Sequence, residues 1–151
     1  MQAKIMFRSS SFHTIDPKGR VIIPARFKTV IEADGDNELM ITINASCIYA
    51  YTMEKWSEIE KKLMAVKLDR MTRFKRVFLG NATLCNCDKQ DRILIPKPLR
   101  NYAGLKKKIV LVGLLDRFEI WSEEGWEMEE NKLKEDLNQP DVRETIASLG
   151  L

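Results

Sequence analysis

The chain has 151 residues, of which 44% are hydrophobic and 31% charged, and its formal net charge is +3. This composition excludes bulk disorder, and the length predicts one domain or two small units that share a core. No apolar run approaches the roughly 20 residues of a membrane span, and the N-terminus lacks the apolar segment of a secretion signal. Three cysteines, an odd number, predict a soluble protein of a reducing cytosol.

The chain contains an internal duplication. Residues 12–28 align with residues 84–100, and residues 39–56 align with residues 109–126. In the first pair of segments, an Asp, an Arg, an Ile and a Pro fall on identical partners. Internal similarity of this kind predicts two copies of one structural unit.

Each copy predicts the same elements in the same order. A strand enters a polar turn, a short β-rich run ends at a proline, and the proline opens a short helical turn. Two strands with rough alternation follow, and an amphipathic helix closes the copy. In the first copy these features are the turn 16–19, Pro24, the strands near 39–43 and 48–51, and a helix capped by Thr52 with Trp56, Ile59, Leu63 and Val66 on one face. In the second copy they are the turn 88–91, Pro96, the strands near 109–111 and 118–120, and a helix capped by Ser122.

One copy has too few strands to close a barrel and would leave open edges. Two copies related by a pseudo-twofold axis could close one together. The predicted fold class is therefore mainly β with helices (α+β), a tandem-repeat, pseudo-dimeric β-barrel with the helices outside. The predicted boundaries are 5–68 and 76–137 for the two copies, which form one compact core, and 138–151 for a C-terminal tail. We expect this tail to fray or to dock on a neighbour.

Charge is unevenly distributed along the chain. Basic residues dominate 4–28, 67–76 and 89–108, whereas acidic residues dominate 116–136. Such separation predicts a surface of positive potential, as expected of a protein that binds a polyanion. A second interpretation, solvated faces that average out after folding, stays open on charge alone.

The repeated polar signature is Asp-x-x-x-Arg, from Asp16 to Arg20 and from Asp88 to Arg92. A tight turn at this spacing can join the carboxylate to the guanidinium, so that the Asp fixes the planar fork of the Arg. Gly19 at the tip allows a positive φ and a close approach by a partner. An oriented Arg on an exposed turn suits contacts with phosphate and with guanine. The alternative is that each Asp–Arg pair only braces its turn.

Four segments follow one another in a specific order and spacing, namely 6–8, 13–24, 88–96 and 118–121. Together they resemble the MraZ family of bacterial transcription regulators, and the resemblance extends from about Met6 to Leu137. It implies an AbrB-like (SpoVT-AbrB) fold, ring-shaped homo-oligomers and a location in the cytoplasm at the nucleoid. It also implies sequence-specific binding of double-stranded DNA at short repeated elements upstream of the family's own division and cell-wall operon. Repression and activation stay open.

The resemblance also implies which residues contact DNA. Matched by position, they are Asp16, Lys18 and Arg20 in the first turn, and Asp88, Lys89 and Arg92 in the second. Asp91 stands where the family's second motif usually has Gly, and Ser9 and Ser10 stand where a Gly is common after Phe-Arg. Asp tolerates a left-handed turn, but a carboxylate at the tip would repel phosphate. We therefore expect the first turn to be the main reader of DNA.

No metal or cofactor is predicted. His13 has no Cys or His at metal-ligand spacing, and the Cys85-x-Cys87 pair and Cys47 lack the second pair that a zinc site needs. We expect the tryptophans to anchor the core and the contacts between subunits rather than to stack on bases. They are Trp56, Trp121 and Trp126.

The chain is predicted not to be an enzyme and to have no small-molecule substrate. Asp16 and Asp88 could share a proton as an aspartic-protease pair does, but the neighbouring Arg would keep each carboxylate ionised. The sequence has no Asp-Thr/Ser-Gly motif, phosphate loop or activated nucleophile. The alternative function is an antitoxin-like β-barrel module that binds a protein or RNA partner. The duplication argues against a simple antitoxin, which would have half this length.

Overall fold

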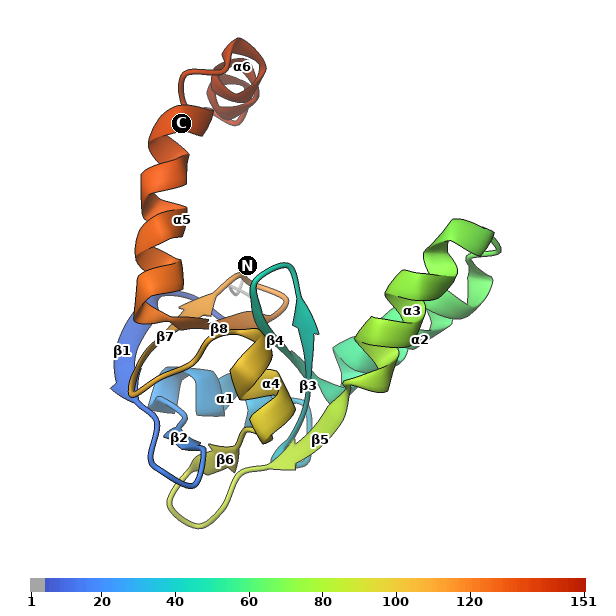
Figure 1. The fold of residues 1–151 in the computed structure, drawn as a ribbon, viewed down its shortest axis with the longest axis vertical. Coiled ribbons are helices and arrows are strands. Elements are labelled where there is room, and N and C mark those ends of the chain that lie inside the picture. Colours follow the sequence, from blue (N-terminus) through green and yellow to red (C-terminus); the bar gives the residue numbers. More distant parts are fainter. Residues whose placement is uncertain (1–4) are drawn as a thin grey trace.

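The computed structural model describes residues 5–151, and each copy of the repeat supplies strands and helices in the same order (Figure 1). The first copy contains β1 (Ser10–Thr14), β2 (Arg20–Ile22), α1 (Ala25–Ala33), β3 (Glu38–Asn44), β4 (Cys47–Thr52), α2 (Met53–Ala65), the 3-10 turn η1 (Asp69–Met71) and α3 (Thr72–Gly80). The second copy contains β5 (Thr83–Asn86), β6 (Arg92–Leu94), α4 (Lys97–Tyr102), β7 (Lys108–Gly113), β8 (Phe118–Ser122), α5 (Glu123–Asp136) and α6 (Pro140–Ser148).

Local sequence signals set the starts of the helices. The Thr52 hydroxyl accepts a hydrogen bond from the N–H of Lys55 at 3.3 Å, and the Ser122 hydroxyl accepts one from the N–H of Gly125 at 2.9 Å. Both predicted N-caps are thus confirmed. The two short helices α1 and α4 follow a proline, as predicted. Helices α3 and α6 were not predicted, and α6 forms where the sequence suggested a frayed or docking tail.

The main antiparallel sheet interleaves the two copies. Its order is β1-β7-β8-β4-β3-β5, and replacing each strand by its counterpart in the other copy gives the same order in reverse. The first strand of each copy pairs with the hairpin of the other copy, and β4 pairs with β8 at the centre. This exchange satisfies strand edges that a single copy would leave open. The two repeats therefore form one sheet and are related by a pseudo-twofold axis, as predicted.

A second, smaller ladder pairs β2 with β6, and it corrects the prediction of a closed barrel. In this ribbon Arg20 lies opposite Leu94, Val21 opposite Ile93, and Ile22 opposite Arg92. Within residues 5–151, β1 and β5 stay at the edges of the six-stranded sheet, so the sheet is open. The physical reason is the short length of β2 and β6, because each stops before a proline that has no N–H to extend the ladder.

The hydrophobic core lies between the main sheet and a layer made by the β2–β6 ribbon, α1 and α4. At its centre Phe7, Phe27 and Phe118 form an aromatic cluster with ring centroids 4.9–5.4 Å apart. Phe118 belongs to the second copy and the other two rings to the first. The two copies therefore share one core, and the ribbon packs against it through Val21 and Ile93.

Helices α2, α3 and α5 project from the sheet and contact its outer face through aromatic side chains near one end of each helix (Figure 1). Trp56 of α2 is 2% exposed and stacks near Phe78 of α3, with ring centroids 5.5 Å apart. Trp121 of β8 is also buried, and Trp126 of α5 packs against it at 6.4 Å. The predicted core role of the tryptophans is confirmed for Trp56 and Trp121. Beyond Trp126, α5 leaves the core, and α6 buries no residue (Figure 1).

Candidate nucleic-acid interface

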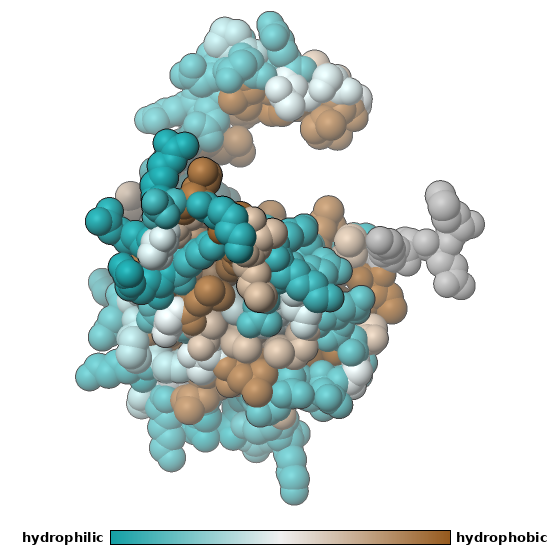
Figure 2. Space-filling view, turned by 90° about the vertical axis from the view of Figure 1, so that its right-hand side faces the viewer, coloured by the Kyte–Doolittle hydropathy of each residue, from teal (hydrophilic) through white to brown (hydrophobic). Residues whose placement is uncertain are grey.

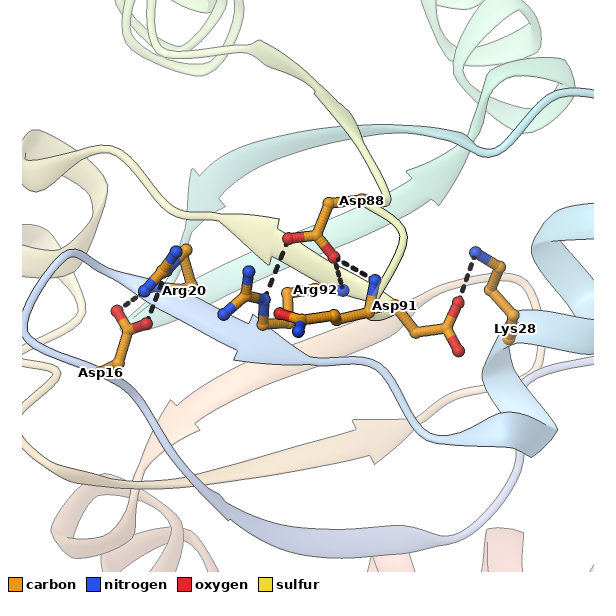
Figure 3. Close-up of polar contacts among 7 residues, drawn as sticks. Asp16, Arg20, Lys28, Asp88, Asp91 and Arg92 are labelled. Atoms are coloured by element: carbon orange, nitrogen blue, oxygen red, sulfur yellow. Dashed lines mark hydrogen bonds and ion pairs between the residues drawn. The ribbon is translucent and has the colours of Figure 1, made fainter.

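The first polar turn is organised around the carboxylate of Asp16. Its Oδ1 accepts hydrogen bonds from the N–H groups of Lys18 and Arg20, both at 2.9 Å. Its Oδ2 pairs with Nε of the Arg20 guanidinium at 2.6 Å (Figure 3). The Asp16 carbonyl also accepts from the N–H of Gly19, which closes the turn. The Arg20 side chain is therefore fixed in direction.

The second polar turn repeats this geometry. Oδ1 of Asp88 accepts from the N–H groups of Gln90 at 2.8 Å and Arg92 at 2.9 Å, and Oδ2 pairs with Nε of Arg92 at 2.9 Å (Figure 3). The duplicated Asp-x-x-x-Arg signature thus folds into two equivalent clamps. The predicted pairing of carboxylate with guanidinium is present in both.

Both clamping carboxylates are ionised at neutral pH. The backbone N–H of Arg20, followed by the Arg20 side chain, lowers the pKa of Asp16 despite an opposing effect of burial. The backbone N–H of Arg92 does the same for the pKa of Asp88. A pair of carboxyls that shares a proton needs one raised pKa. The two Asp residues therefore do not fit the proton-sharing pair considered for an enzyme.

The β2–β6 ribbon places both arginines on one outward surface, here called the ribbon face. Because side chains alternate along a strand, Val21 and Ile93 point into the core, where they are buried. The side chains that alternate with them point outward, and they define the ribbon face as Arg20, Ile22, Arg92 and Leu94. A rigid two-stranded ribbon with fixed arginines has the shape and chemistry that a DNA major groove admits.

The tips of the two turns differ in sequence, and each has its own intramolecular cation. Gly19 has a φ of +90°, and a Cβ there would lie 2.9 Å from the Arg100 guanidinium and from the Ile95 carbonyl oxygen. Asp91, at the matching position, has a φ of +59°, and its Oδ1 lies 3.0 Å from Nζ of Lys28 (Figure 3). Although partial burial opposes it, the hydrogen bond to Asp91 raises the pKa of Lys28.

Sequence reasoning did not identify the tip partners, Lys28 and Arg100. The signal was present, since Lys28 aligns with Arg100 and Gly19 with Asp91. Where the tip is Gly, the cation packs over the backbone, and where it is Asp, the cation forms an ion pair. Lys28 therefore offsets the expected repulsion between Asp91 and phosphate. Because Lys28 is paired with Asp91, it does not add a net positive charge beside the second turn.

Further cations border the first turn. Arg100, Lys106 and Lys107 line a pocket of about 440 Å³ together with Asp16 and Pro17. The tip lysines predicted as DNA contacts, Lys18 and Lys89, are both exposed. More cations therefore border the first turn than the second. The acidic helix α5 runs away from the core on the side opposite both turns (Figure 1), although its first residue, Glu123, lines a pocket with Ile22.

The remaining candidates lie outside this face or are inert. Cys47 and Cys85 are buried, and burial raises the pKa of the Cys85 thiol to about 12. The His13 ring bonds with the hydroxyl of Ser11 at 2.7 Å. Among residues 5–151, no group of three or more His, Cys, Asp or Glu side chains is arranged to hold a metal ion. No helix in the described part of the chain is long and apolar enough to cross a membrane.

Comparison with known proteins decides the family. The family model of the MraZ protein, described as antitoxin-like, matches residues 6–77 and again residues 78–146. The chain belongs to the MraZ family. Three curated relatives, each called transcriptional regulator MraZ, match 97% of this chain and the whole of their own length. Their identities are 60% in Desulforapulum autotrophicum, 49% in Desulfosudis oleivorans and 41% in Ligilactobacillus salivarius. The predicted family is confirmed, and the chain is a transcriptional regulator of the MraZ family.

Proposed function

We propose that this MraZ-family chain binds double-stranded DNA sequence-specifically, at short repeated elements in the promoter of its own division and cell-wall operon. The contacts come from both clamped turns. They are Asp16, Lys18 and Arg20 in the first and Asp88, Lys89 and Arg92 in the second. The observation that carries the proposal is the ribbon face, where two carboxylate-clamped arginines point outward from one rigid ribbon.

The chemistry of each clamp favours base recognition. Because Asp16 takes Nε of Arg20, the two terminal nitrogens of the guanidinium can donate to one guanine through O6 and N7. The clamp also reduces the conformational entropy that the side chain would lose on binding. The tip lysines and the cations near Arg100 supply phosphate contacts, which position the ribbon without reading sequence.

We further propose that the chain forms a ring-shaped homo-oligomer in which an arm of one subunit packs on the helical hairpin of the next subunit. The arm is α5 with α6, and the helical hairpin is α2 with η1 and α3. Figure 2 shows the arm standing clear of the core, with hydrophobic side chains on its lower side. Exposed apolar residues occur on both elements. Those of the arm are Met128, Leu133, Leu137 and Leu149, and those of the hairpin are Met64, Leu68, Val77 and Leu79.

Charge supports the same pairing of arm with hairpin. Helix α5 carries acidic residues along its length, whereas Arg70, Arg73 and Arg76 line a pocket on the hairpin. Complementary charges around apolar centres favour a specific contact between subunits. Because arm and hairpin are different surfaces, the contact is heterologous and generates a ring when its rotation closes. A ring that presents several ribbon faces would bind repeated DNA elements with raised effective concentration.

Replacing two apolar residues of the arm tests the ring. We expect Leu133→Glu with Leu137→Glu to dissociate the oligomer. Both leucines are exposed in the single chain, and the contact between subunits would have to bury a charged group at each position. Light scattering coupled to size-exclusion chromatography measures the mass. Asn131→Glu adds one negative charge on α5 without removing an apolar group, and it should leave the mass unchanged. An unaltered mass in the double variant would contradict the arm-to-hairpin contact.

Fluorescence anisotropy tests DNA binding directly. The purified protein is titrated onto the duplex upstream of its own gene and onto a scrambled duplex of equal composition. A clear preference for the upstream duplex supports the proposal, whereas equal binding leaves only a nonspecific basic surface. No binding to either duplex would favour the antitoxin-like module with a protein or RNA partner.

Salt provides an independent prediction. If lysines and arginines neutralise about six phosphates, affinity should fall about a thousandfold between roughly 50 and 200 mM salt, through counterion release. The same anisotropy titration at several salt concentrations measures the slope. A flat response would rule out phosphate-dominated contact.

The remaining parts of the proposal concern organisation and location. We propose an AbrB-like type for the shared core, with copies at 5–68 and 76–137 and a tail at 138–151. We also propose a cytoplasmic, nucleoid-associated location, which follows from binding to chromosomal DNA.

A further inference from the structure

Two of the four side chains of the ribbon face are exposed aliphatic groups. Ile22 and Leu94 are each 56% exposed, although both lie in strands. Each lies directly opposite an arginine across the ribbon, Ile22 opposite Arg92 and Leu94 opposite Arg20. The face is thus a checkerboard of two arginines and two aliphatic side chains that follows the pseudo-twofold relation of the copies.

The core makes no use of these two aliphatic side chains, although Ile22 also lines a surface pocket with Phe12 and Glu123. The packing of the ribbon against the core is carried by the inward residues, Val21 and Ile93, which are 0% and 1% exposed. A single exposed aliphatic side chain is ordinary. Here the same exposure occurs at matching positions of both copies, next to the two clamped arginines. A polar β-former such as Thr would fit a strand at these positions equally well.

We infer that Ile22 and Leu94 contact the C5-methyl groups of thymines and make the ribbon face selective for thymine beside guanine. The inference rests on the proposed DNA binding and names the base that its aliphatic groups read. In the major groove, the thymine methyl is the one apolar group among the base edges, and aliphatic side chains recognise it by contact.

The spacing of the ribbon fits this assignment. Paired strands lie about 4.8 Å apart, and outward residues two apart along a strand are separated by about 6.6 Å. Successive bases along a DNA strand rise by about 3.4 Å. Each aliphatic side chain therefore falls within about two base steps of the guanine that an arginine reads. The preferred element should hold thymine and guanine at that separation.

Charge favours DNA over a protein as the occupant of this face. The two aliphatic groups lie opposite Arg20 and Arg92 across the ribbon, and Lys18 and Lys89 are exposed at the turn tips. A partner must present negative charge on both sides of a narrow apolar centre. The major groove does so, because phosphates flank a floor on which thymine methyl groups stand.

Replacing thymine by uracil in the upstream duplex tests the inference, since uracil lacks only the methyl group. We expect the wild-type protein to bind the uracil duplex about fourfold more weakly for each contacted methyl. The variant Ile22→Ala with Leu94→Ala should bind both duplexes equally. Both side chains are exposed, so the variant keeps its core. Leu114→Ala, which truncates an exposed leucine outside the ribbon face, should still distinguish the duplexes.

The outcomes separate this inference from the proposed function. Equal wild-type affinity for thymine and uracil duplexes, with preference over the scrambled duplex retained, overturns the methyl contact and leaves specific binding in place. Loss of that preference in the wild type overturns both. Discrimination that persists in the double variant assigns the methyl contact to other residues. If light scattering shows a changed mass for the double variant, with discrimination intact, the face instead serves a second copy of the chain.

Discussion

Arg20→Ala is expected to abolish the preference for the upstream duplex over the scrambled one, and Arg92→Ala to weaken it less. One bidentate contact between arginine and guanine contributes about 1–3 kcal/mol of discrimination. In a ring the loss recurs in every subunit that touches DNA, so its effect on the whole complex is larger. The Asp16 clamp stays folded without the side chain, because two of its bonds come from backbone N–H groups.

The difference between the two arginines follows from their surroundings. Arg20 stands beside the cations that line the pocket at the first turn, whereas the second turn carries Asp91 and uses Lys28 to neutralise it. We therefore expect more phosphate contacts around Arg20 than around Arg92.

Anisotropy with both duplexes measures the effect of each substitution. Leu114→Ala truncates an exposed side chain outside the ribbon face and outside the proposed contact between subunits, and it should behave as the wild type. If Arg20→Ala and Arg92→Ala both keep the promoter affinity of the wild type, the two clamped arginines do not recognise the DNA sequence.

Phe118→Ala is expected to destabilise the whole chain by about 3–5 kcal/mol, the usual effect of removing a fully buried phenyl ring. Phe118 is 0% exposed and touches the rings of Phe7 and Phe27, which come from the other copy. Strand β8, which holds Phe118, also pairs with β4 of the first copy. The cavity therefore opens at the contact between copies and affects both.

Chemical denaturation followed by circular dichroism and by tryptophan fluorescence measures this change. We expect one transition, shifted to lower denaturant, and identical by both methods, because the strands of the copies are interleaved. Val66→Ala, at a half-buried position just beyond α2, is the comparison and should cost far less. Two separate transitions in the Phe118 variant would contradict a single shared core.

The candidate site could largely be predicted from the sequence because its clamps are local. The carboxylate of Asp16 reaches backbone and side-chain donors no more than four residues away, so the spacing alone predicts the geometry. The tip partners could not be predicted in the same way. Lys28 reaches Asp91, and Arg100 reaches Gly19, across the pseudo-twofold axis between copies, and such contacts depend on how the copies pack.

The sequence by itself determined the duplication, the polar turns, the capped helices and the family, because each depends on residues close together in the chain. Only the tertiary structure decided the exchange of strands between copies, the open sheet and the projecting arm. Strand partners are chosen by which edges and apolar faces can be covered at once, and that depends on both copies together. For the same reason the alternation in β2 predicted two faces, while only the packed core decided that Val21 turns inward and that Arg20 and Ile22 face out.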